Sequence, residues 1–401
     1  MNDATYYDKV TDCVRQALLS GSLRFCDLVR ACQGAYPSLV WQILKEMGPQ
    51  VISVRTDVWS LATANRAGAR VPSALSTIEG NPVLQSWYFT DRTCLRIEQL
   101  WNWANHRIAF LGTPRLYEWF ATANLGESRV LLDLDPLVTR ILSASVTDQI
   151  VQYDVRDPLP ERMAGQFTCV ICDPPWYPEE YALWLERARE LASGGVVCVS
   201  LFPVLTRPSS AHERQVILKA MRTNFSFLTT LTEFLEYEIP SFEFFELAHF
   251  GLTGLGPWKL ADLVIGQLNT SSEGAATLSP NGRPAWTEID FGTLRLFVNG
   301  TAGSNPEGPL LATVVGGSDI LPSPSRREPI LQAVNVLSSR GHGLLSHDPL
   351  HLINILDGLS AKPANSVSME DEIGRLNIDP DSKEVLRRLL RQNHSQSLGR
   401  V

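Results

Sequence analysis

Strands and helices alternate along the middle of the chain, and this alternation constrains the fold more than any other feature. Short apolar runs with β-branched residues predict strands at 107–111, 129–134, 149–153, 167–172, 196–202, 227–236 and 260–268. Apolar residues at helical spacing predict helices between them, at 114–123, 136–144, 178–193 and 211–223. An alternating pattern of this kind predicts an α/β fold with a mostly parallel sheet.

The tetrapeptide Asp173-Pro174-Pro175-Trp176 directly follows the apolar run 167–172. In an open α/β sheet, ligands bind beyond the carboxyl ends of such strands. The two prolines make the turn rigid, and Trp176 offers an aromatic face to a planar or cationic group. Asp173 can accept a hydrogen bond from an attacking amine. These four residues are therefore the predicted catalytic residues of an N-methylation site, and the alternative is a plain turn that ends a strand.

Acidic residues also follow the second and third predicted strands. Asp135 ends the run LLDLD, and Asp133 is a second candidate on the same face. A carboxylate here can accept both ribose hydroxyls of an adenosyl cofactor, while Asp154, next to Val155, can hold the adenine amino group. Together with Asp173, these acids after successive strands predict one cofactor site at one edge of the sheet.

The turn Gly112-Thr113-Pro114 follows the first predicted strand and completes this candidate cofactor site. Gly112 allows the backbone to approach a ligand closely, and Pro114 suits the first turn of a helix. The turn lacks the GxGxxG pattern, which disfavours a dinucleotide. Seven strands, with the last two near each other, are the order of a class I methyltransferase, and we predict an S-adenosylmethionine site in its Rossmann-like sheet.

The chain before this sheet predicts a winged-helix domain. Helical apolar spacing at 4–20, 24–33 and 37–47 is followed by an alternating run at 50–62, which predicts a short hairpin. Winged helices bind DNA in many proteins, but they also dimerise or dock substrates. Acidic and basic side chains are nearly equal in number over 1–85. This balance favours docking, and a homodimer through this domain is possible on the same grounds.

The sequence divides into three predicted domains. These are a winged-helix domain at 1–85, a Rossmann-like methyltransferase domain at 86–269 and a C-terminal extension at 270–401. Polar segments rich in glycine and proline predict flexible loops in the extension. Strand structure is expected at 286–298, and a small helical tail with helices at 369–376 and 382–392.

The composition excludes several classes of protein. No run reaches the roughly 18 apolar residues of a membrane span, and the N-terminus MNDATYYDKV lacks the basic and apolar regions of a signal peptide. We therefore expect a cytoplasmic protein with no membrane partner. The formal net charge of −8 argues weakly against nonspecific binding of nucleic acid.

The cysteines and histidines predict no metal site. Seven cysteines without regular spacing fit reduced thiols, and Cys169 and Cys172 are expected in the core. His347 and His351 are four residues apart, but Pro349 between them argues against a regular helix there. No Ser/His/Asp hydrolase pattern is present.

Residues 107–202 resemble the family of N6-adenine-specific DNA methyltransferases, whose eukaryotic members methylate lysine on elongation factor 1A. The segments that carry the resemblance are IAFLGTPRLYEWF, VLLDLDP, YDVRDPLPERMAGQF and VICDPPWYPEE. In this family an aromatic residue follows DPP. The resemblance implies that Gly112, Asp135, Asp154 and Asp173 hold S-adenosylmethionine. It also implies an amine-bearing acceptor, either adenine N6 of a nucleic acid or a protein lysine.

A looser resemblance spans more of the chain. The winged-helix pattern, WYFTDRTCLRIEQL, DVRDPLP and IPSFEFFE are similar to branched-chain polyamine synthases, which transfer aminopropyl groups on the same scaffold. Those enzymes carry an acidic GDDD-type loop where this chain has GTPRL with Arg115, and they lack the aromatic residue after DPP. Methyl transfer is therefore favoured over aminopropyl transfer. A noncatalytic winged-helix regulatory or interaction protein is the third hypothesis.

Overall fold

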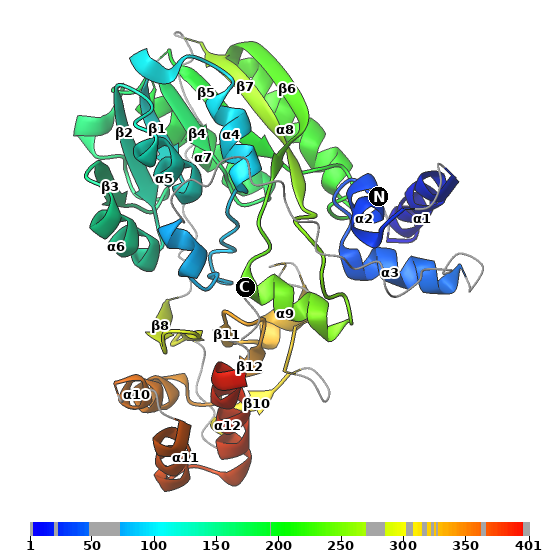
Figure 1. The fold of residues 1–401 in the computed structure, drawn as a ribbon, viewed down its shortest axis with the longest axis vertical. Helices are drawn as coiled ribbons and strands as arrows, with labels where there is room; N and C mark the ends of the chain where they lie inside the picture. Colours follow the sequence, from blue (N-terminus) through cyan, green and yellow to red (C-terminus); the bar gives the residue numbers. More distant parts are fainter. Residues whose placement is uncertain are drawn as a thin grey trace. The chain divides into compact units, whose positions relative to one another are not determined.

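The computed structural model describes ten segments of the chain (Figure 1): 3–19, 23–47, 73–192, 194–269, 285–301, 308–314, 319–321, 325, 328–361 and 366–395. Contacts divide the chain into two compact units. The first contains 1–78, 87–239 and 254–280, and the second contains 79–86, 240–253 and 281–401. The N-terminal helices thus belong to the same unit as the predicted methyltransferase sheet, while the three-domain division at 85 and 269 stays a prediction.

The first unit is built on a seven-stranded sheet with the order β3-β2-β1-β4-β5-β7-β6. The five strands β3, β2, β1, β4 and β5 pair in parallel, and β7 runs antiparallel between β5 and β6. The strands are β1 Arg107–Leu111, β2 Ser128–Asp133, β3 Gln149–Gln152, β4 Cys169–Cys172, β5 Val196–Leu201, β6 Phe225–Glu236 and β7 Leu260–Leu268. The predicted α/β fold is confirmed, with a mixed sheet that resembles those of class I methyltransferases.

Helices cover both faces of this sheet (Figure 1). They are α4 Asp91–Glu98, α5 Pro114–Thr122, α6 Pro136–Ser145, α7 Pro178–Leu191 and α8 Ser210–Asn224. Successive side chains of a strand point to opposite faces. Accordingly, Ile108 and Phe110 of β1 pack in a core cluster with α4, α5 and α6, while Ala109 and Leu111 pack with α7 and α8. Because both faces are covered, the central strands are apolar throughout rather than alternating.

Proline positions several helices directly after the strands. Pro114, Pro136 and Pro178 each occupy the first turn of a helix, where a missing N–H costs no hydrogen bond. Asp135 precedes one of them, and its side chain accepts the backbone N–H of Leu137 at 2.9 Å. These short connections keep the carboxyl ends of the parallel strands at one edge of the sheet.

The three helices predicted at the start of the chain are present: α1 Asp3–Leu19, α2 Phe25–Ala31 and α3 Pro37–Glu46. The hairpin predicted at 50–62 lies outside the described residues, so the winged helix stays a prediction. The helices contact the loop that follows β5 and the end of β6. Tyr6 donates a hydrogen bond to the Leu205 carbonyl at 2.8 Å, and Arg30 pairs with Glu236 at 2.9 Å.

The second unit contains a five-stranded antiparallel sheet with the order β10-β12-β11-β9-β8. Its strands are β8 Trp286–Asp290, β9 Arg295–Asn299, β10 Ala312–Thr313, β11 Val336–Ser338 and β12 Gly343–Leu345, and its helices are α9 Ser241–His249, α10 Pro349–Ser360, α11 Ser366–Arg375 and α12 Pro380–Ser395. Strand structure at 286–298 and the last two helices are confirmed. The expectation that the rest of the extension is only a helical tail is wrong, since it also contains the strands β10, β11 and β12. These strands have two or three residues each and are too short to show a period in the sequence.

Helix α10 corrects another prediction, since Pro349 begins this helix instead of excluding it. Asp348 caps the helix by accepting the N–H of His351 at 3.2 Å. His351 therefore lies in the helix and His347 precedes it. Among the described residues, no group of three or more His, Cys, Asp or Glu side chains is arranged to hold a metal ion.

The cysteine prediction is confirmed: all seven are free thiols, and Cys169 and Cys172 are buried in the sheet. No helix within the described segments combines the length and the apolar character needed to cross a bilayer.

Candidate active site

Asp173 lies at the carboxyl edge of the sheet, directly after β4, as the sequence predicts. Strand β4 is central, with β1 on one side and β5 on the other. The backbone N–H of Asp173 donates to the Leu111 carbonyl at 3.3 Å, so the turn is tied to the end of β1. The side chain is partly buried. It is therefore fixed in position and still accessible.

Two hydroxyl groups orient the Asp173 carboxylate. Ser200 of β5 and Tyr237, which follows β6, both donate to Oδ1, the latter at 2.9 Å. Both donors are almost fully buried. Within the described part of the chain, no hydrogen bond reaches Oδ2. One oxygen therefore holds the side chain in place, and the other is available to an N–H donor from a ligand.

The pKa of Asp173 is raised to about 6. Burial is the main cause, because it disfavours the charged form. The hydrogen bonds from Ser200 and Tyr237 and the positive charge of Lys259 all act in the opposite direction. Asp173 is consequently ionised at neutral pH and protonated a little below it.

Trp176 forms an aromatic wall beside this carboxylate. Its ring lies 5.8 Å from that of Tyr237, edge to face, and 6.2 Å from that of Phe202. Pro174 is buried, and the carbonyl of Pro175 accepts the N–H of Tyr177 at 2.7 Å. The two prolines thus turn the chain so that Trp176 contacts residues beyond β5 and β6.

A lysine and two further tryptophans lie at the same site and were not predicted from the sequence. The Lys259 ammonium is 3.5 Å from the centre of the Trp87 ring and 4.3 Å from the centre of the Trp176 ring. Trp258 packs edge-on against Trp87. Their positions in the sequence, before α4 and before β7, give no signal because the fold alone brings them to Asp173. The sequence marks Ser200 only weakly, as the single hydroxyl residue in the apolar run VVCVSLF.

The three predicted cofactor residues Gly112, Thr113 and Pro114 lie in the turn after β1. Gly112 has φ +63°, and a Cβ at this position would lie 2.4 Å from the Trp184 ring. Thr113 is buried, and Pro114 begins α5. A side chain at position 112 is therefore excluded both by the left-handed backbone and by the close approach of Trp184.

The two acids at the end of β2 differ in their local structure. Strand β2 ends at Asp133, whereas Asp135 is 1% exposed and caps α6 through Leu137. The expectation that Asp135 ends the strand is therefore wrong, because the Asp-Pro pair begins the helix. Asp133 is partly buried, and burial raises its pKa to about 7 although it accepts the N–H of Asp135 at 2.9 Å. Of the two carboxylates, Asp133 is the more exposed.

Asp154 lies two residues beyond the end of β3 at the same edge. Its carboxylate accepts the backbone N–H of Arg156 at 3.1 Å, which forms a local turn. Val155 is buried, and its carbonyl accepts Nε of Arg187 at 2.9 Å. Asp154 is partly exposed, as a group that meets a ligand must be.

These residues fit an adenosyl cofactor. The site combines a glycine turn after β1, a carboxylate at the end of β2 and an acid after β3, all at one edge of a parallel sheet. Brought together at that edge, such groups can accept the ribose hydroxyls and the adenine amino group. The chemistry of this set of groups therefore suits S-adenosylmethionine.

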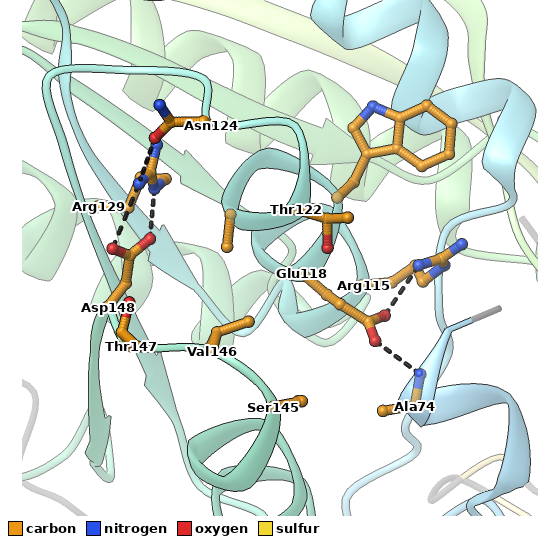
Figure 2. A pocket seen from close by; sticks show the side chains of 12 residues that line it. Ala74, Arg115, Glu118, Thr122, Asn124, Arg129, Ser145, Val146, Thr147 and Asp148 are labelled. Atoms are coloured by element: carbon orange, nitrogen blue, oxygen red, sulfur yellow. Dashed lines mark hydrogen bonds and ion pairs between the residues drawn. The ribbon is translucent and has the colours of Figure 1, made fainter. Parts of the chain in front are cut away.

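A hollow in this unit lies beside α5 (Figure 2). It has a volume of about 470 Å³ and is lined by residues of α5, of the end of α6 and of the starts of β2 and β3. Arg129 pairs with Asp148, and Arg115 pairs with Glu118 at 2.8 Å (Figure 2). Arg115 also pairs with Asp91.

The sheet order and the acids at its carboxyl edge define the fold of the class I methyltransferases. Within this fold, residues 81–244 match the family model for probable N6-adenine methyltransferases. The match supports the predicted resemblance. It also supports an enzyme that is an S-adenosylmethionine-dependent N-methyltransferase.

Solved structures match this chain at low identity. The branched-chain polyamine synthase C9 mutein from Thermus thermophilus, in complex with N4-aminopropylspermidine and 5'-methylthioadenosine, has a TM-score of 0.50 and 18% identity, over 68% of this chain and 90% of that one. A putative RNA methyltransferase from Pyrococcus horikoshii has a TM-score of 0.34 and 13% identity, over 49% and 96%. At 18% identity, the likeness to the polyamine synthase shows only that the fold is similar. A comparison with curated protein sequences gives no match.

Proposed function

We propose that this protein methylates an amino group that Asp173 holds in place, either adenine N6 or a protein lysine. The observation that carries the proposal is the asymmetric use of the Asp173 carboxylate. Ser200 and Tyr237 fix Oδ1, and no hydrogen bond from the described residues reaches Oδ2. An acceptor N–H can therefore bind Oδ2 without displacing a protein group.

The residues of the site position the acceptor more than they activate it. Asp173 orients the nitrogen lone pair, Trp176 stacks against the acceptor, and the Pro174 carbonyl can take a second N–H. When bound, S-adenosylmethionine supplies a methyl group on a positive sulfur, and the N–C bond forms as the S–C bond breaks. Asp173, with a pKa of about 6, can then hold the proton that the nitrogen releases. Correct placement supplies most of the rate enhancement.

On the cofactor side, we propose that Gly112, Thr113 and Pro114 form the turn against which S-adenosylmethionine lies. Asp133 accepts the ribose hydroxyls in preference to Asp135, which supports the start of α6. Asp154 and Val155 hold the adenine ring.

The role of the N-terminal helices belongs to the same proposal. We infer that residues 1–85 form a winged helix that docks substrate or joins two copies in a cytoplasmic homodimer. The helical part and the near balance of charge support this inference. Sedimentation of the full chain at several concentrations tests the dimer, and a monomer throughout would exclude it.

The experiment is methyl transfer from tritiated S-adenosylmethionine to a single-stranded adenine oligonucleotide and to a lysine-containing peptide. We expect one acceptor to be labelled by the wild type, and Asp173→Asn to lower the rate by at least about 100-fold, the scale of a lost positioning and proton-transfer group. Asp148→Asn, in the hollow of Figure 2, is the matched control and should keep the rate.

Two results would overturn the proposal. Transfer of an aminopropyl group from decarboxylated S-adenosylmethionine to spermidine, without methyl transfer, would assign the chain to the polyamine synthases. Calorimetry that detects binding of neither cofactor would leave a regulatory or interaction protein.

A further inference from the structure

Lys259 occupies the position at the site where a cationic substrate would be expected to bind. Its ammonium lies against two indole rings, 3.5 Å from the centre of Trp87 and 4.3 Å from the centre of Trp176. Its charge acts on the nearby Asp173 carboxylate. Two aromatic faces with a carboxylate nearby are what proteins use to bind ammonium groups of ligands. We call Trp87, Trp176 and Lys259 the indole clamp.

The surrounding residues hold the indole clamp in this arrangement. The ring of Trp87 packs edge-on against Tyr237 at 6.3 Å and against Trp258 at 6.2 Å. The carbonyl of Lys259 accepts the N–H of Tyr237 at 3.1 Å, which fixes the lysine backbone beside the residue that orients Asp173. Tyr237 therefore contacts both the indole clamp and the Asp173 carboxylate.

A positive charge at this point bears on the choice of acceptor. Two unit charges about 4 Å apart near a protein surface repel by several kcal/mol, which corresponds to roughly 10- to 1,000-fold in affinity. A protonated lysine or polyamine would meet this repulsion on reaching Trp176. An amino group on a nucleobase is uncharged, and its ring can stack on the same indole.

We propose that Lys259 is a specificity residue that excludes ammonium acceptors and selects an uncharged amino group on a nucleobase. This inference rests on the proposed methyl transfer and chooses between its two acceptor classes. Lys259 fills the cation position with the protein's own charge, so Asp173 Oδ2 is left for the amino group of a neutral acceptor.

Lys259→Met tests this inference because methionine has a similar length and no charge. Calorimetry in saturating S-adenosylhomocysteine would compare spermidine and a lysine peptide with a single-stranded adenine oligonucleotide. We expect the wild type to bind the oligonucleotide and to bind spermidine at least about 10-fold more weakly than Lys259→Met does. Lys259→Arg keeps the charge and should behave as the wild type. Lys219→Met, on the exposed face of α8, is the matched control for loss of a lysine.

The outcomes separate this inference from the proposed function. If the wild type does not bind S-adenosylhomocysteine, the proposed function fails. If it binds the cofactor but methylates the lysine peptide, and Lys259→Met loses that activity, only the present inference fails; Lys259 would then assist removal of the acceptor's proton, as a neighbouring cation can. Unchanged spermidine affinity in a folded Lys259→Met, checked by thermal unfolding, would also overturn it.

Discussion

The carboxyl edge of the sheet and the hollow beside α5 both gather acids and cations, but they use them differently. In the hollow, each of two arginines is paired with a carboxylate: Arg129 with Asp148 and Arg115 with Glu118 (Figure 2). At the carboxyl edge, neutral hydroxyls hold Asp173, and the nearby cation lies against indole rings. A charge that is already paired adds little to ligand binding, whereas Asp173 keeps one oxygen for a ligand. The two regions therefore differ in the partners of their charged groups and not in the number of these groups.

The same distinction between Asp133, the last residue of β2, and Asp135, which caps α6, gives the largest expected effect on cofactor binding. Asp133→Asn should weaken S-adenosylmethionine binding by about 10- to 100-fold, since hydrogen bonds to a charged group contribute about 1.5–3 kcal/mol. Asp135→Asn is the matched variant and should change the affinity by less than about threefold, because asparagine also caps a helix well. Calorimetric titration of both variants measures this. The reverse order of effects would restore Asp135 as the ribose residue.

The pH dependence of cofactor binding sharpens this test. The pKa of Asp133 is raised to about 7, and ribose hydroxyls bind its ionised form better. Affinity of the wild type should therefore rise as pH increases through 7 and level off above it. In Asp133→Asn the rise should disappear. A rise that persists in this variant would mean that another group titrates.

The second prediction concerns an ion pair in the hollow, whose loss should lower stability and leave activity nearly unchanged. Asp148→Asn leaves Arg129, whose side chain is 9% exposed, without its charged partner. The free energy of unfolding should fall by about 1–3 kcal/mol, as for a mostly buried donor that loses its acceptor. Urea denaturation measures the loss, and kcat/KM should stay within about twofold. A large loss of activity would mean that the hollow has a functional role.

The smallest effect is expected from a group that only orients the catalytic carboxylate. In the proposed mechanism the carboxylate form of Asp173 is the active one, so kcat/KM should fall as pH drops through about 6. Tyr237→Phe removes a hydrogen bond that lowers this pKa, so the acidic limb of the profile should move to higher pH. Tyr117→Phe, a buried tyrosine of α5 that bonds the Gln149 carbonyl, is the control. A limb that does not move, or moves to lower pH, would contradict the orienting role of Tyr237.

The sequence by itself determined the sheet, the helices around it and the position of Asp173. Periodicity identified all seven strands of the first unit to within two residues at each end, because strands buried on both faces are strongly apolar. It also predicted that the acids after β2, β3 and β4 would meet at one edge. The short strands of the second unit were missed, since two or three residues carry no measurable period.

Only the tertiary structure decided which side chains work with Asp173. Ser200, Tyr237, Trp87 and Lys259 come from four separate segments, and no local pattern links them. The structure also showed that Asp135 supports a helix while Asp133 ends the strand. The physical reason is that periodicity depends on burial along one element, whereas a site depends on distances between elements. Those distances exist only after the sheet, the N-terminal helices and their connecting loops have packed together.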